Sequence, residues 1–449
     1  MEHVIHMVFL NILTRKTLKL KERPLIVMEG SLANYQNASS EEMKLKILNL
    51  IEKVKKYKGE FVFLWHNSSF ILLFGKSTKI FMKRFYLMKI LTVLGARPQF
   101  IKAGPVSREI KRLRSEGVNI EEIIVHTGQH YDRNMSDVFF EELQLPIPDY
   151  YLGVGGKSHG AMTGEMIIKL EEVMFKEKPD VVLVYGDTNS TLAGAITASK
   201  LHVPIAHVEA GLRSFNMNMP EEINRVLTDR LSKWLFCPTD AAVENLKKEG
   251  FENFDCRIVK SGDVMYDAVL FYKKYAKKPK LDFGIQPLSF VLVTVHRAEN
   301  TDDEKRLRNI IEALEEISRE ISVIFPVHPR TRQKLRVYNI CTDSPSLHMI
   351  EPVSYLEMVW LLDNCKLVMT DSGGLQKEAY FFKKPCITLR DETEWIELVK
   401  NKVNILVGAE KKKILNAYHQ FVNTTINNFI TNLYGNGDAS KKIVRELIG

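Results

Sequence analysis

The 449-residue sequence predicts an α/β protein built on parallel sheets, and three observations support this fold class. Short apolar runs rich in β-branched residues alternate with longer segments of helical periodicity along most of the chain. These runs do not alternate apolar with polar residues, which is typical of strands buried on both faces of a sheet. The alternation also occurs in two separate series, which a stretch rich in Lys and Pro divides at residues 272–287.

The first series begins at Met88, where the sequence resembles the beginning of a separate protein. Its apolar runs predict strands at residues 89–93, 123–126, 181–185, 205–208, 234–237 and 257–259. Helical periodicity predicts intervening helices at residues 100–114, 134–143 and 161–176. Strands and helices therefore alternate from the first strand onward, as in a sheet covered on both faces.

The second series repeats this alternation. Strands are predicted at residues 290–295, 323–327, 348–350, 366–370 and 385–389. Helices are predicted at residues 304–319, 355–363, 374–382 and 438–448. We therefore expect two Rossmann-like domains that face each other across a cleft, residues 88–270 and 271–434. Residues 435–449 are expected to form a C-terminal helix that packs back on the first domain.

Residues 1–87 lack the pattern of the rest of the chain. A helical pattern at residues 40–58 and an aromatic run at residues 61–65 make too small a segment for a domain with its own core. This segment holds 15 Lys and Arg against 7 Asp and Glu, whereas the remaining residues hold 48 of each sign. The net charge of +8 therefore belongs to an N-terminal extension and does not indicate a nucleic-acid-binding surface on the main body.

Composition limits the class of protein. Hydrophobic residues make up 45% of the chain, which is enough for sizeable cores. The five cysteines are scattered without CxxC or CxxH spacing, which predicts a reducing compartment and neither a disulfide framework nor a zinc site. No signal peptide is recognisable, and the longest apolar stretch, residues 61–74, is too short to cross a bilayer. We expect a cytoplasmic protein that does not enter a membrane.

Two predicted strands of the first domain are followed by acidic residues, Asp187 and Glu209. In an open α/β sheet, ligands bind outside the carboxyl ends of the strands, so both carboxylates should face one crevice. The predicted helix that begins at Pro220 should bring Glu221 or Glu222 close to them.

Converging carboxylates suit proton abstraction, because crowding and burial raise some of their pKa values. The alternative is a structural role, in which these acids cap helices or pair with Arg213 and Arg225. Spacing by itself leaves both interpretations open.

The segment Asp371-Ser372-Gly373-Gly374 follows a predicted strand and opens a predicted helix. Its two glycines let the backbone approach a ligand closely, and the helix start offers free N–H groups and a positive dipole end. This arrangement suits a diphosphate, and Glu378, on the next turn, can reach a ribose hydroxyl. The alternative is a tight turn with an Asp or Ser cap.

A second candidate anion site ends the first predicted strand, where the sequence reads GARP. Arg97 supplies a planar fork of donors, and Lys102 lies one turn into the helix. The chain contains neither a GxGxxG fingerprint nor a GxxxxGK[ST] loop. Nicotinamide, flavin and P-loop ATP sites are therefore not expected.

Two histidines, His296 and His328, end consecutive predicted strands of the second domain, and an arginine closely follows each. A lone histidine is more often structural, but this repeated placement favours phosphate binding or proton transfer. No HxxxH or HxH spacing accompanies them, so a metal site is not expected.

Taken together, these stretches resemble the non-hydrolysing UDP-N-acetylglucosamine 2-epimerase family. The matching motifs, in the order of the family, read GARPQFIKAGPVSR, HTGQHYD, VYGDTNSTLAG, HVEAGLRS, MPEEINR, TVHRAEN, PVHPR, TDSGGLQKEA and YGNGDAS. They belong to residues 88–449. The resemblance implies a GT-B-like arrangement of the two domains, a homodimer, and catalysis without a metal or a nicotinamide.

The resemblance also implies a reaction at C2 of a UDP-2-acetamido sugar, interconverting UDP-N-acetylglucosamine and UDP-N-acetylmannosamine. A base removes the C2 proton while UDP leaves C1, and UDP returns to the glycal as a proton arrives on the opposite face. The acid and base groups that it implies are Asp187, Glu209, Glu221 and His296. The UDP-contacting residues that it implies are Arg97, Lys102, His328, Ser372, Gly373, Gly374 and Glu378.

The sequence departs from the family pattern in two places. Members acting on UDP-N-acetylglucosamine often read HRRENxG, where this chain has Ala298, Thr301 and Asp302. They often read TERPEA, where this chain reads TEWIE at residues 393–397. Both differences resemble the branch that acts on UDP-2,3-diacetamido-2,3-dideoxyglucuronic acid, which is the alternative substrate for the same mechanism.

Two further resemblances concern other classes of protein. Residues 24–32 and 59–70 resemble the tail of a polysaccharide deacetylase-like protein, so we expect the N-terminal extension to be a fusion remnant. A GT-B glycosyltransferase would share the two-domain fold and the nucleotide site, but it would transfer the sugar to an acceptor.

Overall fold

The computed structural model describes residues 25–28, 42, 45, 49, 62–64, 87–129, 140, 144–145, 147–424, 429 and 432–449. The chain divides into two compact units, Met1–Leu87 and Met88–Gly449. In the first unit, strands β1 (Leu25–Met28) and β2 (Val62–Leu64) pair in parallel. Most of the segments on which the fusion-remnant interpretation rests lie outside the described residues, so that interpretation stays a prediction.

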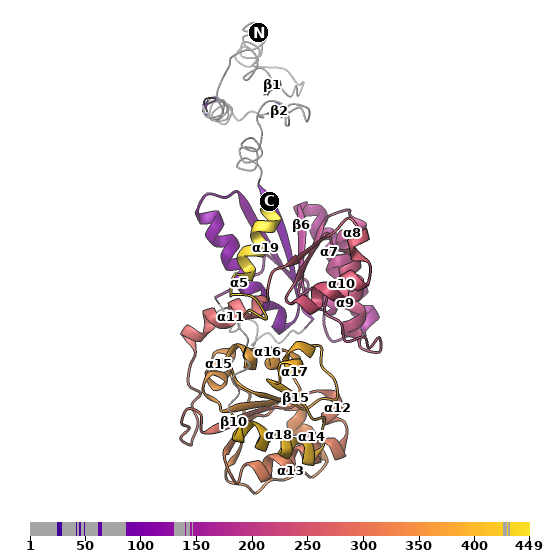
Figure 1. Ribbon diagram of the computed structural model, residues 1–449. Coiled ribbons are helices and arrows are strands. Elements are labelled where there is room, and N and C mark those ends of the chain that lie inside the picture. Colours follow the sequence, from indigo (N-terminus) through magenta and orange to yellow (C-terminus); the bar gives the residue numbers. More distant parts are fainter. Residues whose placement is uncertain are drawn as a thin grey trace. The chain divides into compact units, whose positions relative to one another are not determined.

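The unit Met88–Gly449 contains two parallel sheets, one in each of the two lobes that Figure 1 shows. The strands of the first sheet are β3 (Met88–Leu94), β4 (Ile120–His126), β5 (Tyr150–Tyr151), β6 (Val181–Tyr185), β7 (Ile205–Val208), β8 (Trp234–Cys237) and β9 (Arg257–Lys260). Their order across the sheet is β5-β4-β3-β6-β7-β8-β9, and every neighbouring pair is parallel.

The second sheet has the same design with one strand fewer. Its strands are β10 (Phe290–Thr294), β11 (Ser322–Pro326), β12 (Leu347–Ile350), β13 (Leu367–Thr370), β14 (Cys386–Thr388) and β15 (Asn404–Leu406). Their order is β12-β11-β10-β13-β14-β15, again with parallel pairs throughout.

Both sheets have the strand order of a Rossmann fold, in which the chain first runs outward on one side of the first strand and then continues on its other side. The order reverses between β3 and β6 in the first sheet and between β10 and β13 in the second. A crevice opens at such a switch point, beyond the carboxyl ends of the strands. The predicted α/β fold with two Rossmann-like domains is confirmed.

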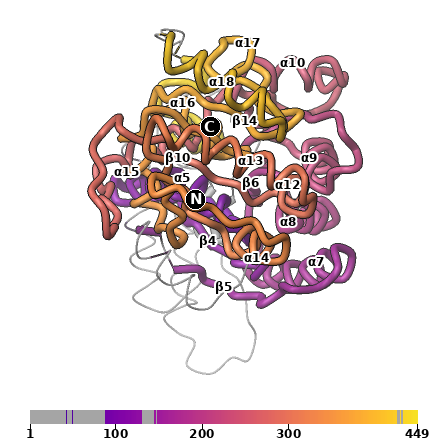
Figure 2. The backbone as a smooth tube through the Cα atoms, turned by 90° about the horizontal axis from the view of Figure 1, so that it is seen from below, coloured from indigo at the N-terminus to yellow at the C-terminus, as the bar shows by residue number. Residues whose placement is uncertain are grey.

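Helices connect the strands and cover the sheets. In the first lobe they are α5 (Arg97–Ser115), α7 (His159–Glu177), α8 (Asn189–Lys200), α9 (Pro220–Leu231), α10 (Asp240–Lys248) and α11 (Val264–Tyr272). The remaining helices are α12 (Ala298–Thr301), α13 (Glu304–Ile317), α14 (Pro329–Val337), α15 (Tyr355–Asn364), α16 (Gly373–Phe381), α17 (Ile396–Lys400), α18 (Lys411–Asn423) and α19 (Ala439–Ile448). Figure 2 shows α7, α8 and α9 side by side, in agreement with their contacts.

Burial on both faces explains why the central strands carry few polar residues. Successive side chains of β3 point to opposite faces of the sheet. Ile90 and Leu94 pack into one buried cluster with residues of α5, α11 and α19. Leu91 and Val93 pack into another cluster with residues of α7 and α8. Since each face meets helices, an apolar residue is favoured at nearly every strand position.

The last helix, α19, lies against α5 of the first lobe, as Figure 1 shows in yellow and indigo. Asp267, on α11, holds its start, because the Asp267 carboxylate accepts the backbone N–H groups of Ala439 at 3.1 Å and Ser440 at 2.8 Å. Helix α11 in turn contacts α16 of the second lobe. The domain boundaries at residues 270 and 434 remain predictions.

Several elements were not predicted from the sequence: helices α8, α10, α11, α12, α14, α17 and α18, and strands β5 and β15. The edge strands β5 and β15 have only two and three residues, too few to show a period. Apart from Phe140, the helix predicted at residues 134–143 lies mostly outside the described residues. Within the part of the chain that the structure describes, no helix is both long enough and apolar enough to span a bilayer.

Candidate active site

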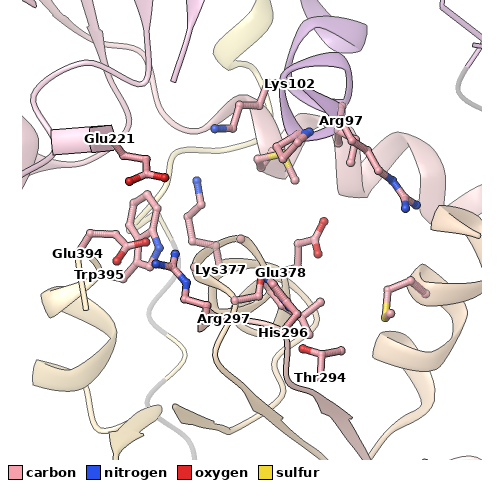
Figure 3. Close-up of a pocket in the computed structure, with 18 of the residues that line it drawn as sticks. Arg97, Lys102, Glu221, Thr294, His296, Arg297, Lys377, Glu378, Glu394 and Trp395 are labelled. Carbon is pink, nitrogen blue, oxygen red and sulfur yellow. The ribbon is translucent and has the colours of Figure 1, made fainter. Parts of the chain in front are cut away.

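The switch points of the two sheets face a shared cavity of about 640 Å³. Figure 3 shows Arg97, Lys102 and Glu221 reaching toward it from the first lobe, opposite Lys377 and Glu378 of the second. The structure brings every site residue predicted from the sequence to the wall of this cavity: Arg97, Lys102, Asp187, Glu209, Glu221, His296, His328, Ser372, Gly373, Gly374 and Glu378.

The turn between β13 and α16 forms an open helix start at the cavity. Ser372 is the N-cap of α16, and its hydroxyl accepts the backbone N–H of Leu375. A Cβ added at Gly373 would lie 2.2 Å from Oε1 of Glu394, so this position has no room for a side chain. A Cβ added at Gly374 would meet nothing within 4 Å. Free N–H groups at such a start attract an anion.

Asp371 organises the neighbouring strand end. Its carboxylate is fully buried and accepts the backbone N–H groups of His296 at 3.1 Å and Arg297 at 3.0 Å. These bonds fix the loop after β10. The ring centroids of His296 and His328 are 5.9 Å apart, so the two predicted histidines form one pair at the cavity wall. Burial, reinforced by the nearby His296, lowers the pKa of His328, which favours a neutral ring there.

The strand-end acid Asp187 is held by a charge from α9. Arg225 of α9 forms ion pairs with both Asp187 and Glu222. Asn224 donates from its side-chain amide to the backbone carbonyl of Asp187 at 2.9 Å. The ion pair with Arg225 that the structural interpretation expected is present, and Asp187 also lines the cavity, so its role in proton transfer stays a prediction.

Glu221 and Glu222 differ in their surroundings, although they are adjacent in the sequence. Glu221 lines the cavity. Glu222 is buried, and its carboxylate accepts the backbone N–H groups of Ser214 at 3.0 Å and Phe215 at 2.9 Å. Burial opposes ionisation of Glu222, but these N–H groups and Arg225 lower its pKa. Glu222 is therefore a structural carboxylate, and Glu221 is the member of the pair that can reach a ligand.

Glu209 has an uncommon backbone, with φ of 75° in the left-handed region. Such strain in a non-glycine residue is typical of functional sites. Its carboxylate binds two ammonium groups, that of Lys102 through Oε2 and that of Lys377 through Oε1 at 2.6 Å. Burial raises the pKa of Glu209, but the two ammonium groups outweigh burial and lower it to about 2.

Glu209 and Glu222 are therefore not among the acids whose pKa is raised by crowding and burial. The two lysines that lower the pKa of Glu209 come from elements distant in sequence, and a strand-end pattern cannot show them. Glu378 behaves differently, because burial raises its pKa to about 7. The hydroxyl of Tyr355 lies 3.2 Å from its Oε1 and provides a hydrogen bond.

Comparison with known proteins assigns the family. The sequence model of the UDP-N-acetylglucosamine 2-epimerase family matches residues 111–448, which is more than half of the chain. The chain belongs to the UDP-N-acetylglucosamine 2-epimerase family. The resemblance that the nine motifs indicated is thereby confirmed, with the isomerase class that it implied.

Several members of the epimerase family are similar over nearly their whole length. The UDP-2,3-diacetamido-2,3-dideoxy-D-glucuronate 2-epimerase of Pseudomonas aeruginosa is 55% identical over 361 residues, which cover 80% of this chain and 99% of that protein. The UDP-N-acetylglucosamine 2-epimerase of Methanocaldococcus jannaschii is 46% identical over 370 residues, with the same coverage.

Solved structures of the family share the fold. The Methanocaldococcus jannaschii enzyme in complex with UDP-N-acetylglucosamine and UDP superposes with a TM-score of 0.72, covering 80% of this chain and 99% of that one. The Neisseria meningitidis enzyme bound to UDP-N-acetylglucosamine is 32% identical and has a TM-score of 0.71, covering 80% of this chain and all of that one. The GT-B-like arrangement implied by the resemblance is confirmed.

In this member of the epimerase family, the cavity is also lined by charged groups that were not predicted from the sequence. The most buried is Lys377, which directly precedes Glu378. Its second partner, Asp263, follows β9 in the sequence Ser-Gly-Asp. An acid just beyond the end of a strand was the signal that identified Asp187 and Glu209, and the same signal applied to β9 finds Asp263. Arg297, Glu394 and Trp395 complete this side of the wall.

Proposed function

We propose that the protein is a UDP-2-acetamido-sugar 2-epimerase that interconverts UDP-N-acetylglucosamine and UDP-N-acetylmannosamine. One observation carries the proposal. The first lobe presents three carboxylates, Asp187, Glu209 and Glu221, to the cavity. The second lobe presents the helix start at Ser372 to the same cavity. A diphosphate at that helix start would place the sugar attached to it within the cavity, among the carboxylates.

The reaction requires a base and a proton donor on opposite faces of the sugar. A carboxylate takes the C2 proton, the C–H electrons form the C1–C2 double bond, and the C1–O bond breaks with its electron pair on UDP. For the other epimer, UDP adds back at C1 while a proton reaches C2 from the opposite face. Neither step changes the oxidation state of the sugar, and UDP is both leaving group and nucleophile.

We infer that the second lobe stabilises the departing UDP. The backbone N–H groups at Gly373 and Gly374, with the positive end of the α16 dipole, face the negative charge that develops on the diphosphate. Arg97, at the start of α5, adds a guanidinium from the other side of the cavity. Glu378 lines the same wall and is assigned the ribose hydroxyls.

Most residues assigned to proton transfer come from the first lobe. The second lobe contributes His296. Asp187, Glu209 and Glu221 reach the cavity from three different elements, so they can approach a bound sugar from different directions. Placement on both faces matters because the C2 proton is only weakly acidic. His328 is assigned to UDP, and its lowered pKa favours a ring that can accept or donate one hydrogen bond at neutral pH.

A second candidate substrate is UDP-2,3-diacetamido-2,3-dideoxyglucuronic acid, for the same reaction. The observation that favours it is the 55% identity to the Pseudomonas aeruginosa enzyme named for that sugar, against 46% for the Methanocaldococcus jannaschii enzyme. Both substrates carry the 2-acetamido group and the UDP leaving group. They differ at C3 and C6 of the sugar.

The test is C2 proton exchange in deuterated water. Each UDP-sugar is incubated separately with the purified protein, without an acceptor, and the recovered nucleotide sugar is analysed by NMR and mass spectrometry. Deuterium at C2 together with the second epimer supports the proposal, and the sugar with the higher kcat/KM is the substrate. A glycosyltransferase would show neither product. No exchange with either sugar would exclude the epimerase.

We further propose that the protein acts as a homodimer in the cytoplasm. Helix α9 exposes Ile223, Leu227 and Leu231, which recur every four residues and share one face of the helix. An apolar stripe of this kind suits a contact with a second copy. Light scattering of the purified protein should give the mass of two chains, and the mass of one chain would contradict the dimer.

A further inference from the structure

We propose that Lys377 is a positioning residue for Glu209, acting across the cavity from the opposite lobe. The proposal rests on the proposed epimerase function and adds a residue with no other assigned role in that reaction. Lys377 belongs to α16, the helix whose start is assigned to the diphosphate. Glu209 follows β7 of the other sheet. A single helix would thus bind the leaving group and hold a carboxylate of the proton-transfer machinery.

The geometry of Lys377 is that of a fixed group. Its ammonium lies 2.6 Å from Oε1 of Glu209 and 2.7 Å from Oδ2 of Asp263. The Lys377 side chain is only 2% exposed. The ring of Trp395 lies against the same ammonium, 4.1 Å from ring centroid to Nζ. A lysine held by two carboxylates and an aromatic face has no freedom to follow a substrate.

Asp263 makes this burial possible. It is 2% exposed, and its other oxygen accepts the backbone N–H of Met265 at 2.8 Å, which fixes it at the start of α11. Glu209 and Asp263 carry two negative charges, and Lys102 and Lys377 carry two positive charges. The four groups therefore form a neutral cluster, in which burial of each charge is offset by a partner.

The two lysines that bind Glu209 differ in what they can do. Lys102 comes from α5, the helix that also provides Arg97, and it lines the cavity from that side. Lys102 can therefore turn toward a diphosphate when the substrate binds. Lys377 cannot, because Asp263 and Trp395 enclose it. When Lys102 leaves Glu209, Lys377 remains and keeps the Glu209 carboxylate in place and ionised.

This division of roles predicts how the basicity of Glu209 depends on the substrate. The charged groups that face Glu209 are Lys102 from α5 and Lys377 from α16, with Asp263 beyond Lys377. With both lysines in place, the pKa of Glu209 is about 2, although burial opposes ionisation. Withdrawal of Lys102 toward the diphosphate removes one of the two attractions. Glu209 then becomes a stronger base at the moment when substrate is present.

The test compares Lys377→Met with the double variant Lys377→Met/Asp263→Asn. The single variant removes the ammonium at nearly constant length, and it leaves Asp263 buried without its cation. The double variant neutralises that carboxylate as well and is expected to recover thermal stability. Lys260→Met is the matched control, because Lys260 forms an exposed ion pair with Asp240 outside the cavity.

Both variants that lack Lys377 are expected to lose about 10- to 100-fold in kcat for C2 exchange, while KM changes little. On the acid side, their rate should begin to fall at a higher pH than that of the wild type, because one ammonium group fewer then opposes the effect of burial on Glu209. Asp263→Asn alone keeps the ammonium on Glu209. The exchange rate of this variant should therefore fall on the acid side at no higher pH than that of the wild type.

A double variant with the kcat and acid limb of the wild type would show that Lys377 only stabilises the fold, and would overturn the proposal. The proposal would also be overturned if Asp263→Asn raised the pH of the acid-side fall in exchange rate as much as Lys377→Met does. A folded wild type without exchange on any UDP-2-acetamido sugar overturns the proposed function instead, and the role of Lys377 falls with it. Wild-type exchange combined with the losses described above supports both.

Discussion

Arg225 holds Asp187 at the cavity and Glu222 behind it, through one ion pair to each carboxylate. The guanidinium comes from α9, whereas Asp187 follows β6. Asp187, which is assigned to proton transfer, is thus held by a guanidinium that also binds the buried carboxylate of Glu222. Substitutions at Asp187, Glu221 and Glu222 therefore separate chemistry from structure within one small region.

Asp187→Asn should lower the rate of C2 exchange by about 100-fold or more, because an amide cannot take up or deliver the proton. UDP should still bind, since the assigned diphosphate and ribose contacts lie elsewhere. Exchange by NMR and UDP affinity by calorimetry measure the two effects. Asp255→Asn is the control, because Asp255 is almost fully exposed. Near-full exchange in Asp187→Asn would remove Asp187 from the proton-transfer step.

The neighbouring glutamates should respond in opposite ways. Glu221→Gln is expected to lower kcat and leave thermal stability unchanged, because Glu221 lines the cavity. Glu222→Gln is expected to lower the free energy of unfolding by about 3 kcal/mol, since its amide would face Arg225 and two backbone N–H groups as a donor. Thermal unfolding and exchange rates of both variants decide the matter. If Glu222→Gln lost activity without losing stability, the assignment would have to be reversed.

The two glycines at the start of α16 offer a steric test of the diphosphate site. An alanine at Gly374 enters open space in the cavity, so Gly374→Ala should fold normally and weaken UDP binding by about tenfold or more. An alanine at Gly373 must displace Glu394, which Arg390 holds at 2.8 Å, so Gly373→Ala should lose thermal stability as well. Unchanged UDP affinity in a folded Gly374→Ala variant would place the diphosphate elsewhere.

The buried carboxyl group of Glu378 makes stability depend on pH. Burial raises its pKa from the usual 4.5 to about 7, so the folded state favours the protonated form. Its contribution to stability is therefore fully present below about pH 4.5 and is lost as the pH rises toward 7. Over that window, the wild type should lose about 3 kcal/mol relative to Glu378→Gln. Urea titrations of both proteins at each pH measure the two free energies of unfolding. If the difference between them did not change with pH, a protonated Glu378 would be contradicted.

Removal of residues 1–87 tests the proposed domain organisation. The family match and both sheets lie in residues 88–449, so the truncated protein should fold and exchange the C2 proton at nearly the full rate. Thermal unfolding and exchange measured beside the full chain give the comparison. A truncated protein that is folded but inactive would contradict the fusion-remnant interpretation.

Local sequence predicted the α/β class, most strands of the two large sheets, and the placement of candidate site residues after strands, but it missed several helices. Strands buried on both faces must be apolar nearly throughout, so β3, β6 and β10 were recognisable without knowledge of their neighbours. In a parallel sheet the residue after a strand always lies at the same edge, and this geometry brought Asp187, Glu209 and His296 to the cavity. Edge strands such as β15 are too short to carry a period.

Only the tertiary structure decided which charges surround each carboxylate. The sequence identified Glu209 as one of several converging acids, some of which were expected to have a raised pKa, whereas Lys102 and Lys377 lower the pKa of Glu209. These lysines are 107 positions before Glu209 and 168 positions after it. Electrostatic attraction depends on distance in space, which the packing of the two lobes sets and sequence spacing does not contain. The sequence by itself thus determined which acids follow strands, and the tertiary structure determined the charges that set their pKa values.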